Sequence, residues 1–178
     1  AQLPLALRFP PDQRFETFVA APAGALEQLR VLASREGGDW LYLAGAASTG
    51  KSHLALAACA HAQELGRRVA YLPLASASGR MEDALSALHD YDLVALDGLE
   101  AVAGRGGDEK ALFDFHNRAR DAGAGVLYAA TVAAPELPVA LPDLRPRLSQ
   151  CVRIRLQPLD DAGRREVLRL RARRRGLQ

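Results

Sequence analysis

The architecture of this chain can be inferred from one segment, Gly45-Ala46-Ala47-Ser48-Thr49-Gly50-Lys51-Ser52. It fits the phosphate-loop pattern G-x-x-x-x-G-K-[ST] without a gap. It follows the apolar run Trp40–Ala44 and opens a stretch of helical character, Lys51–Leu65. A strand, this loop and a helix, in that order, form the context that the pattern requires. The segment therefore predicts a nucleotide-phosphate site; the alternative is a glycine-rich turn between a strand and a helix.

Each part of this loop has a chemical role in binding phosphate. Gly45 and Gly50 permit a tight backbone, and the loop amides form an anion-binding nest at a helix N-terminus. Lys51 supplies positive charge for the β- and γ-phosphates, and Ser52 offers a hydroxyl to Mg²⁺. Lys110 is the only other lysine in a chain whose basic residues are mostly arginines.

An apolar run that ends in aspartate supplies a second part of the site. Leu93–Leu96 is predicted to be a buried strand, and Asp97 follows it directly. Beside a phosphate loop, this carboxylate can hold the shell of Mg²⁺; alone, it could cap a turn. Gly98 comes next. Because glycine has no carboxylate that could polarise an attacking water, we expect the chain's own ATP hydrolysis to be slow. Glu100 is a candidate substitute whose geometry the sequence leaves open.

The rest of the chain alternates predicted strands and helices. Strands are expected at 40–44, 69–72, 93–96, 126–130 and 151–156, and helices at 23–34, 51–65, 81–89, 109–122 and after the capping residue Asp160. Short apolar strands alternating with helices predict an α/β fold, with a five-stranded parallel sheet covered on both faces. Such folds bind ligands at the carboxyl ends of their strands.

Composition and charge narrow the class of protein. With 178 residues, 49% hydrophobic and 25% charged, the chain is expected to bury a real core, which excludes whole-chain disorder, collagen and a disulfide scaffold. It has no apolar run of roughly 18 residues, and no signal peptide is predicted at Ala1–Pro4. Cys59 and Cys151 are predicted to be buried free thiols, which fits a reduced, cytoplasmic location.

The C-terminal segment is strongly basic. Arg164–Arg175 carries seven arginines and one glutamate, a net charge of +6 in a chain of net charge +2. This charge suits nucleic acid, but no aromatic residues interleave, so direct DNA binding is not expected. The favoured interpretation is a lid helix with a solvated face, whose Val167, Leu168 and Leu170 face the nucleotide domain.

Several segments together resemble the DnaA-related AAA+ family, and within it the Hda group of regulatory inactivators of DnaA more than DnaA itself. The similarity covers nearly the whole chain and includes Gly45–Leu54, Asp92–Gly104, Leu112–Arg118, Leu141–Leu148 and Leu156–Leu159. It implies a P-loop AAA+ three-layer αβα fold. The implied domains are an extended arm (1–13), the AAA+ domain (14–158) and the start of an incomplete helical lid (159–178).

The resemblance also implies a function. Such a protein binds ADP or ATP with Mg²⁺ and, with the DNA polymerase III sliding clamp, stimulates ATP hydrolysis by DnaA in trans. It thereby limits repeated initiation of replication. The oligomeric state and the working nucleotide stay open. Other interpretations are a small-molecule P-loop kinase, a DNA-binding AAA+ ATPase such as a helicase loader, and a nucleotide-gated adaptor.

The resemblance assigns roles to individual residues. Arg147 takes the arginine-finger position, with Arg145 and Arg153 as competitors. Thr131, where the family often has aspartate, takes the first sensor position; it could also be a plain strand-end threonine. The catalytic set is then Arg147, Asp97 and Thr131, and the metal ligands are Ser52 and Asp97. The nucleotide-binding set is Gly45, Ala46, Ala47, Ser48, Thr49, Gly50, Lys51, Ser52, His53, Phe18 and Val19.

Two segments near the N-terminus, one aromatic and one apolar, each allow two interpretations. Phe15 and Phe18 precede the first helix, in the segment that the resemblance assigns to the adenine pocket, but core packing explains them equally well. The arm Gln2–Leu7 resembles a Q-L-x-L-x-L clamp-binding peptide, in which Gln2, Leu3, Leu5 and Leu7 would contact the clamp. From composition alone, an N-terminal strand packed on its own domain is the alternative.

Overall fold

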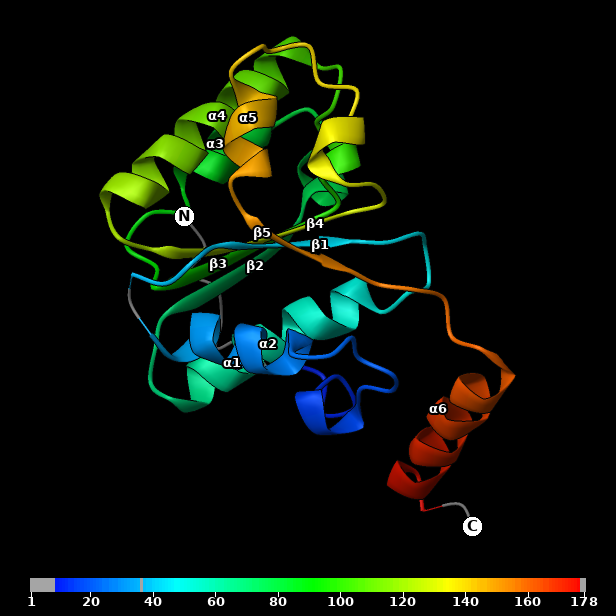
Figure 1. Ribbon diagram of the computed structural model, residues 1–178. Helices are drawn as coiled ribbons and strands as arrows, with labels where there is room; N and C mark the ends of the chain where they lie inside the picture. The colour runs from blue at the N-terminus through cyan, green and yellow to red at the C-terminus, as the bar shows by residue number, and fades with distance from the viewer. Residues whose placement is uncertain (1–8, 36, 177–178) are drawn as a thin grey trace.

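The computed structural model describes residues 9–35 and 37–176 (Figure 1). Its centre is a five-stranded sheet in which neighbours pair in parallel, in the order β2-β3-β4-β1-β5. The strands are β1 (Leu41–Ala44), β2 (Val69–Pro73), β3 (Leu93–Asp97), β4 (Gly125–Ala130) and β5 (Val152–Arg155). The predicted α/β fold with a five-stranded parallel sheet is confirmed.

Helices cover both faces of the sheet. They are α1 (Ala25–Ser34), α2 (Lys51–Glu64), α3 (Met81–Ser86), α4 (Gly106–Asp121), α5 (Leu144–Ser149) and α6 (Asp161–Arg174). Figure 1 shows α1 and α2 on one face, α3, α4 and α5 on the other, and α6 beyond the sheet. No helix in the described ranges is long and apolar enough to cross a membrane.

The strands divide their side chains between two hydrophobic cores. In β1, Leu41 and Leu43 pack with α1 and α2, whereas Tyr42 and Ala44 pack with α3 and α4. This alternation follows from the two-residue period of a strand. Because both faces of β1, β3 and β4 are buried, these strands are almost continuously apolar, whereas the edge strand β5 alternates and exposes Arg153 and Arg155.

Most of the buried side chains of helix α2 are small, and the helix packs against the sheet. Ala55, Ala58, Cys59 and Ala62 are all buried, and α2 packs against β2, β3 and β4. Its first turn begins at Lys51, directly after the loop that leaves β1. The packing of α2 therefore fixes the phosphate loop at the carboxyl ends of the strands.

Two helices have other bounds than expected: α3 ends at Ser86 instead of residue 89, and α4 begins at Gly106 instead of residue 109. Two further segments differ in kind. Helix α5 was not expected, because it is short and contains Pro146. Residues 9–13 were expected to be extended, but Gln13 N donates to Pro10 O at 3.0 Å and closes a turn. The apolar ring of Phe9 is buried with the α1–α2 core, which draws this segment onto the domain.

Candidate functional site

The phosphate loop needs both of its glycines for close packing. Gly50 has φ 94°, and a Cβ there would lie 2.5 Å from Cε2 of Phe18. A Cβ on Gly45 would lie 2.6 Å from Oγ1 of Thr49 and 3.0 Å from the carbonyl oxygen of Leu156. Any larger residue would therefore displace the loop or its neighbours.

Lys51 extends along the loop. Its Nζ donates to the carbonyl oxygens of Gly45 at 2.5 Å and Ala46 at 2.9 Å. Burial lowers the pKa of Lys51, and the negative charges of Glu100 and Asp97 act against this shift. The ammonium group is thus held where the loop meets the nearby carboxylates.

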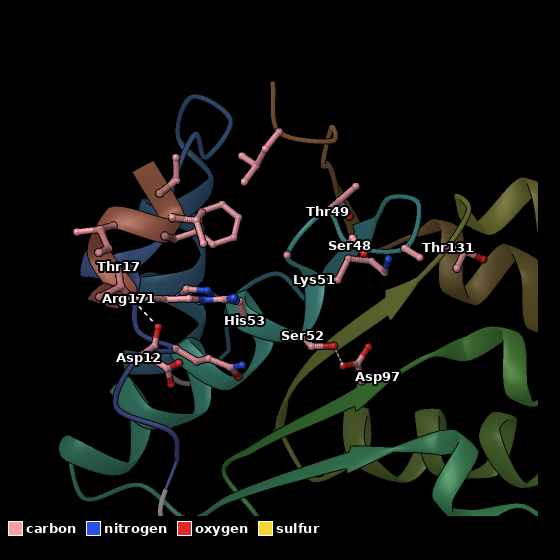
Figure 2. A pocket seen from close by; sticks show the side chains of 18 of the residues that line it. Asp12, Thr17, Ser48, Thr49, Lys51, Ser52, His53, Asp97, Thr131 and Arg171 are labelled. Carbon is pink, nitrogen blue, oxygen red and sulfur yellow. Dashed lines mark hydrogen bonds between the residues drawn. The ribbon is translucent and has the colours of Figure 1, made fainter. Parts of the chain in front are cut away.

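Asp97 ends β3 and contacts the first turn of α2. Its Oδ2 accepts hydrogen bonds from Oγ of Ser52 at 2.5 Å and from the hydroxyl of Tyr71 at 2.6 Å. Burial, followed by the hydrogen bond and charge of Asp97, raises the pKa of Tyr71, so its hydroxyl stays a donor. The structure therefore brings the two predicted Mg²⁺ ligands, Ser52 and Asp97, into direct contact (Figure 2).

A cavity of about 640 Å³ follows the phosphate loop. Most predicted nucleotide-binding residues line it: Phe18, Val19, Ala47, Ser48, Thr49, Gly50, Lys51, Ser52 and His53, together with Asp97 and Thr131. Gly45 and Ala46 are not among the lining residues, because they form the base of the loop that holds Lys51. Phe15 does not line it either; it is buried in the core with its ring near His61.

The end of the cavity away from Asp97 is aromatic. The rings of Phe18 and His53 meet edge to face with centroids 5.1 Å apart. Nε2 of His53 donates to the carbonyl oxygen of Arg14 at 2.7 Å, which fixes the tautomer. Burial lowers the pKa of His53, the Arg14 contact acts against this, and Arg171 adds to the lowering. Near neutral pH the imidazole is therefore uncharged.

Helix α6 lines this same end of the cavity. Its lining residues are Val167, Leu170, Arg171 and Arg174, spaced at i, i+3, i+4 and i+7, which is one face of a helix. That spacing is a signal that could have identified the face. The expectation for Leu168 was wrong: it is 64% exposed, because it points away from this stripe.

The cavity fits a nucleotide with Mg²⁺. At the aromatic end, Gln13 lines the cavity, and its Oε1 is buried without a hydrogen-bond partner in the described ranges. At the other end, Ser52 and Asp97 supply the hard oxygens that Mg²⁺ prefers. The described residues contain no group of three or more His, Cys, Asp or Glu able to hold a metal. Mg²⁺ usually binds one or two carboxylates together with phosphate oxygens, so this donor set suits it.

The three candidate arginines have different surroundings. Nη2 of Arg145 donates to the carbonyl oxygens of Leu137 at 2.8 Å and Val139 at 3.2 Å, so this side chain is a structural tie. Arg153 is exposed on β5. Arg147 lies on α5, outside the cavity lining, with Cζ 5.8 Å from the ring centre of Phe113.

The segment that leads to α5 is anchored by a buried carboxylate. Glu109 on α4 is 0% exposed and accepts hydrogen bonds from Gly104 N at 2.6 Å, Leu141 N at 2.7 Å and Ala140 N at 2.9 Å. Burial acts to raise the pKa of Glu109, but these hydrogen bonds and Arg145 outweigh it, and the pKa is lowered. Nothing in the sequence marked Glu109, because an acidic first turn normally indicates an exposed helix start.

The proposed clamp-contacting residues Gln2, Leu3, Leu5 and Leu7 lie outside the described residues. Thr131 lies at the end of β4, where its backbone N–H donates to Oε2 of Glu100 at 3.2 Å.

Solved structures with the AAA+ fold match this architecture, whereas no family model matches the sequence. The fold is the one found in DnaA. Domain III of Thermotoga maritima DnaA matches with TM-score 0.80 and 21% identity, over 97% of this chain and 78% of that chain. DnaA bound to AMPPCP and single-stranded DNA matches with TM-score 0.76 and 19% identity, over 96% of this chain and 57% of that chain.

A third similar structure is AMPPCP-bound DnaA from Aquifex aeolicus, with TM-score 0.74 and 22% identity over 96% of this chain. The present chain spans 57% of the length of that structure. The predicted three-layer AAA+ fold, as found in DnaA, is therefore confirmed, and two of these DnaA structures contain the nucleotide analogue AMPPCP.

Proposed function

We propose that this chain is a nucleotide-binding AAA+ regulator of replication initiation, of the Hda type, that acts in the cytoplasm. It binds ADP or ATP with Mg²⁺ in the cavity beside the phosphate loop. Together with the sliding clamp, it stimulates ATP hydrolysis by DnaA in trans through Arg147. The AAA+ domain covers residues 14–158, and residues 159–178 belong to a helical lid.

The position of Arg147 is the observation that carries this proposal. It does not line the cavity of its own chain, and its guanidinium has no hydrogen-bond or ion-pair partner among residues 9–35 and 37–176. A guanidinium supplied across an interface can neutralise charge that develops on a γ-phosphate. The competitor Arg145 is already bound to backbone carbonyls.

The decisive experiment measures hydrolysis of DnaA-bound, radiolabelled ATP with clamp loaded on DNA. Arg147→Ala is expected to reduce the stimulated rate by about 10³-fold, the lower end of what an arginine finger supplies. ADP binding by the variant should be unchanged. Arg153→Ala removes an exposed arginine nearby and should keep full stimulation. Equal activity of Arg147→Ala and the unaltered chain would refute the assignment.

The clamp contact rests on the sequence of the N-terminal arm alone. Deleting residues 1–7 is expected to abolish capture of the chain by immobilised clamp while ADP binding is retained. Capture of the shortened chain at the original level would show that the clamp contacts lie elsewhere.

A further inference from the structure

No acidic residue follows Asp97 directly, but the side chain of Glu100 reaches the space beside Gly98 that such a residue would occupy. Gly98 has φ 87° and ψ 58°, a left-handed conformation that turns the chain into the short 3-10 helix η3 (Leu99–Ala101). A Cβ on Gly98 would lie 3.8 Å from Oε1 of Glu100, with no other neighbouring atom within 4 Å. That separation is about the reach of a glutamate side chain from its own Cβ. The turn therefore returns a carboxylate to the space that a side chain at position 98 would enter.

Glu100 is held between the ends of two adjacent strands. Its Oε2 accepts the backbone N–H of Thr131 at 3.2 Å, just after β4, and Gly98 N donates to Ala129 O at 2.8 Å. These contacts join the end of β3 to the end of β4. Oε1 of Glu100 has no hydrogen-bond partner within the described part of the chain, so one oxygen is available as an acceptor.

The other carboxylates of the cavity are engaged or distant. Asp97, Glu100 and Asp12 are the acidic side chains that line it. Oδ2 of Asp97 already accepts from Ser52 and Tyr71. Asp12 lies at the aromatic end beside Thr17 and His53, away from Lys51 and Thr131 (Figure 2). Oδ1 of Asp97 also has no hydrogen-bond partner within the described residues. Asp97 is, however, assigned to Mg²⁺ together with Ser52, so Glu100 is the carboxylate at the phosphate end that is left for a water.

We infer that Glu100 is the catalytic base for ATP hydrolysis by this chain, in place of an acid directly after Asp97. The inference rests on the proposed binding of ATP. The water oxygen forms a bond to the γ-phosphorus, and the bond from that phosphorus to the β–γ bridging oxygen breaks. The electron pair leaves with ADP, and the proton of water passes to Glu100 and then to solvent. Although position 98 is a glycine, the chain therefore keeps a catalytic base, and its ATP hydrolysis depends on Glu100.

Single-turnover hydrolysis of radiolabelled ATP with Mg²⁺ by the full chain tests this role. Glu100→Gln keeps the size of the side chain and an acceptor oxygen but cannot take the proton. It is expected to lower the rate by about 10²-fold or more, the usual contribution of general base catalysis. The Kd for a fluorescent ATP analogue should not change. Glu136→Gln is the matched control, because Glu136 is exposed and does not line the cavity, and it should keep the full rate.

Three results would overturn the inference: an unchanged rate in Glu100→Gln, a loss of ATP-analogue affinity that accounts for the lower rate, or a wild-type rate no faster than ATP alone. Each of these results can be distinguished from a failure of the proposed function. Stimulation of DnaA is read out from DnaA-bound ATP and depends on Arg147, so it can persist when the chain's own hydrolysis does not.

Discussion

Lys51 is the single residue whose charge bears most directly on phosphate binding. It is 9% exposed, and its Nζ is bound to two loop carbonyls at the end of the cavity that holds Ser52 and Asp97. A bound phosphate would compete for the same donor protons, so the contribution of Lys51 can be measured as a change in affinity.

Lys51→Ala is expected to raise the Kd for ADP about 10- to 100-fold, because a hydrogen bond to a charged group contributes about 1.5–3 kcal/mol. Isothermal titration calorimetry would measure the change. Lys110→Ala is a natural control, since Lys110 is exposed and pairs with Asp114 one turn away on α4. Similar losses in the two variants would mean that general charge, not the loop, governs affinity.

At the residue scale, the site was predictable where its chemistry is local in sequence. The loop and Asp97 follow consecutive patterns, and both lie where those patterns predict. Glu100 and Gln13 were not assignable, because turns outside regular periodicity decide where their side chains point. The family resemblance favoured Arg147 over Arg145 by motif position, but only the tertiary contacts of Arg145 show that its side chain is engaged.

At the scale of elements, Glu109 ties α4 to the segment that precedes α5. Glu109→Ala leaves three buried N–H groups without their acceptor, at about 1–3 kcal/mol for each unsatisfied group before relaxation. We expect the free energy of unfolding in urea to fall by about 3 kcal/mol, within the range for loss of a buried hydrogen-bond network. Glu64→Ala, at an exposed position of α2, should change it by less than about 0.5 kcal/mol.

The same residue predicts a pH dependence of stability. The pKa of Glu109 in the folded chain is below its ordinary value of 4.5. Its contribution is therefore complete above pH 4.5 and is lost as the pH falls through the folded-state pKa. The difference in unfolding free energy between the unaltered chain and Glu109→Gln should shrink in that acid range. A difference that stays constant between pH 7 and pH 3 would argue against this linkage.

Most elements were predictable because apolar runs and glycines mark their bounds. The expected cap of α6 is confirmed, since Oδ1 of Asp160 accepts from Gly163 N at 2.7 Å. Helix α5 could not be predicted, because a short helix containing Pro146 has little local preference and depends on burying Leu144 and Leu148. Tertiary packing therefore determines the element that carries Arg147.

At the scale of the whole molecule, the two cysteines report on global unfolding. Cys59 and Cys151 are free and buried, as expected, and burial raises the pKa of each thiol to about 12. Because the thiolate is the reactive form, neither should react with a disulfide reagent in the folded chain. Both should react in urea, with the same midpoint as circular dichroism. Stoichiometric labelling of the folded chain would contradict this.

The fold class was predictable from the alternation of strands and helices, but the strand order β2-β3-β4-β1-β5 was not. Periodicity indicates which residues are buried, not which strand lies beside which. That order places β4 between β1 and β3, so the distance from Lys51 to Asp97 depends on the whole sheet.

The chain path from β5 to α6 has a mechanical consequence. Leu156 N donates to Ala44 O at 2.8 Å, and the Leu156 carbonyl borders Gly45 at the base of the phosphate loop. Only 157–160 separate this contact from α6, whose inner stripe faces the opposite end of the cavity. Because this connection is short, a displacement of α6 is expected to move the base of the phosphate loop as well.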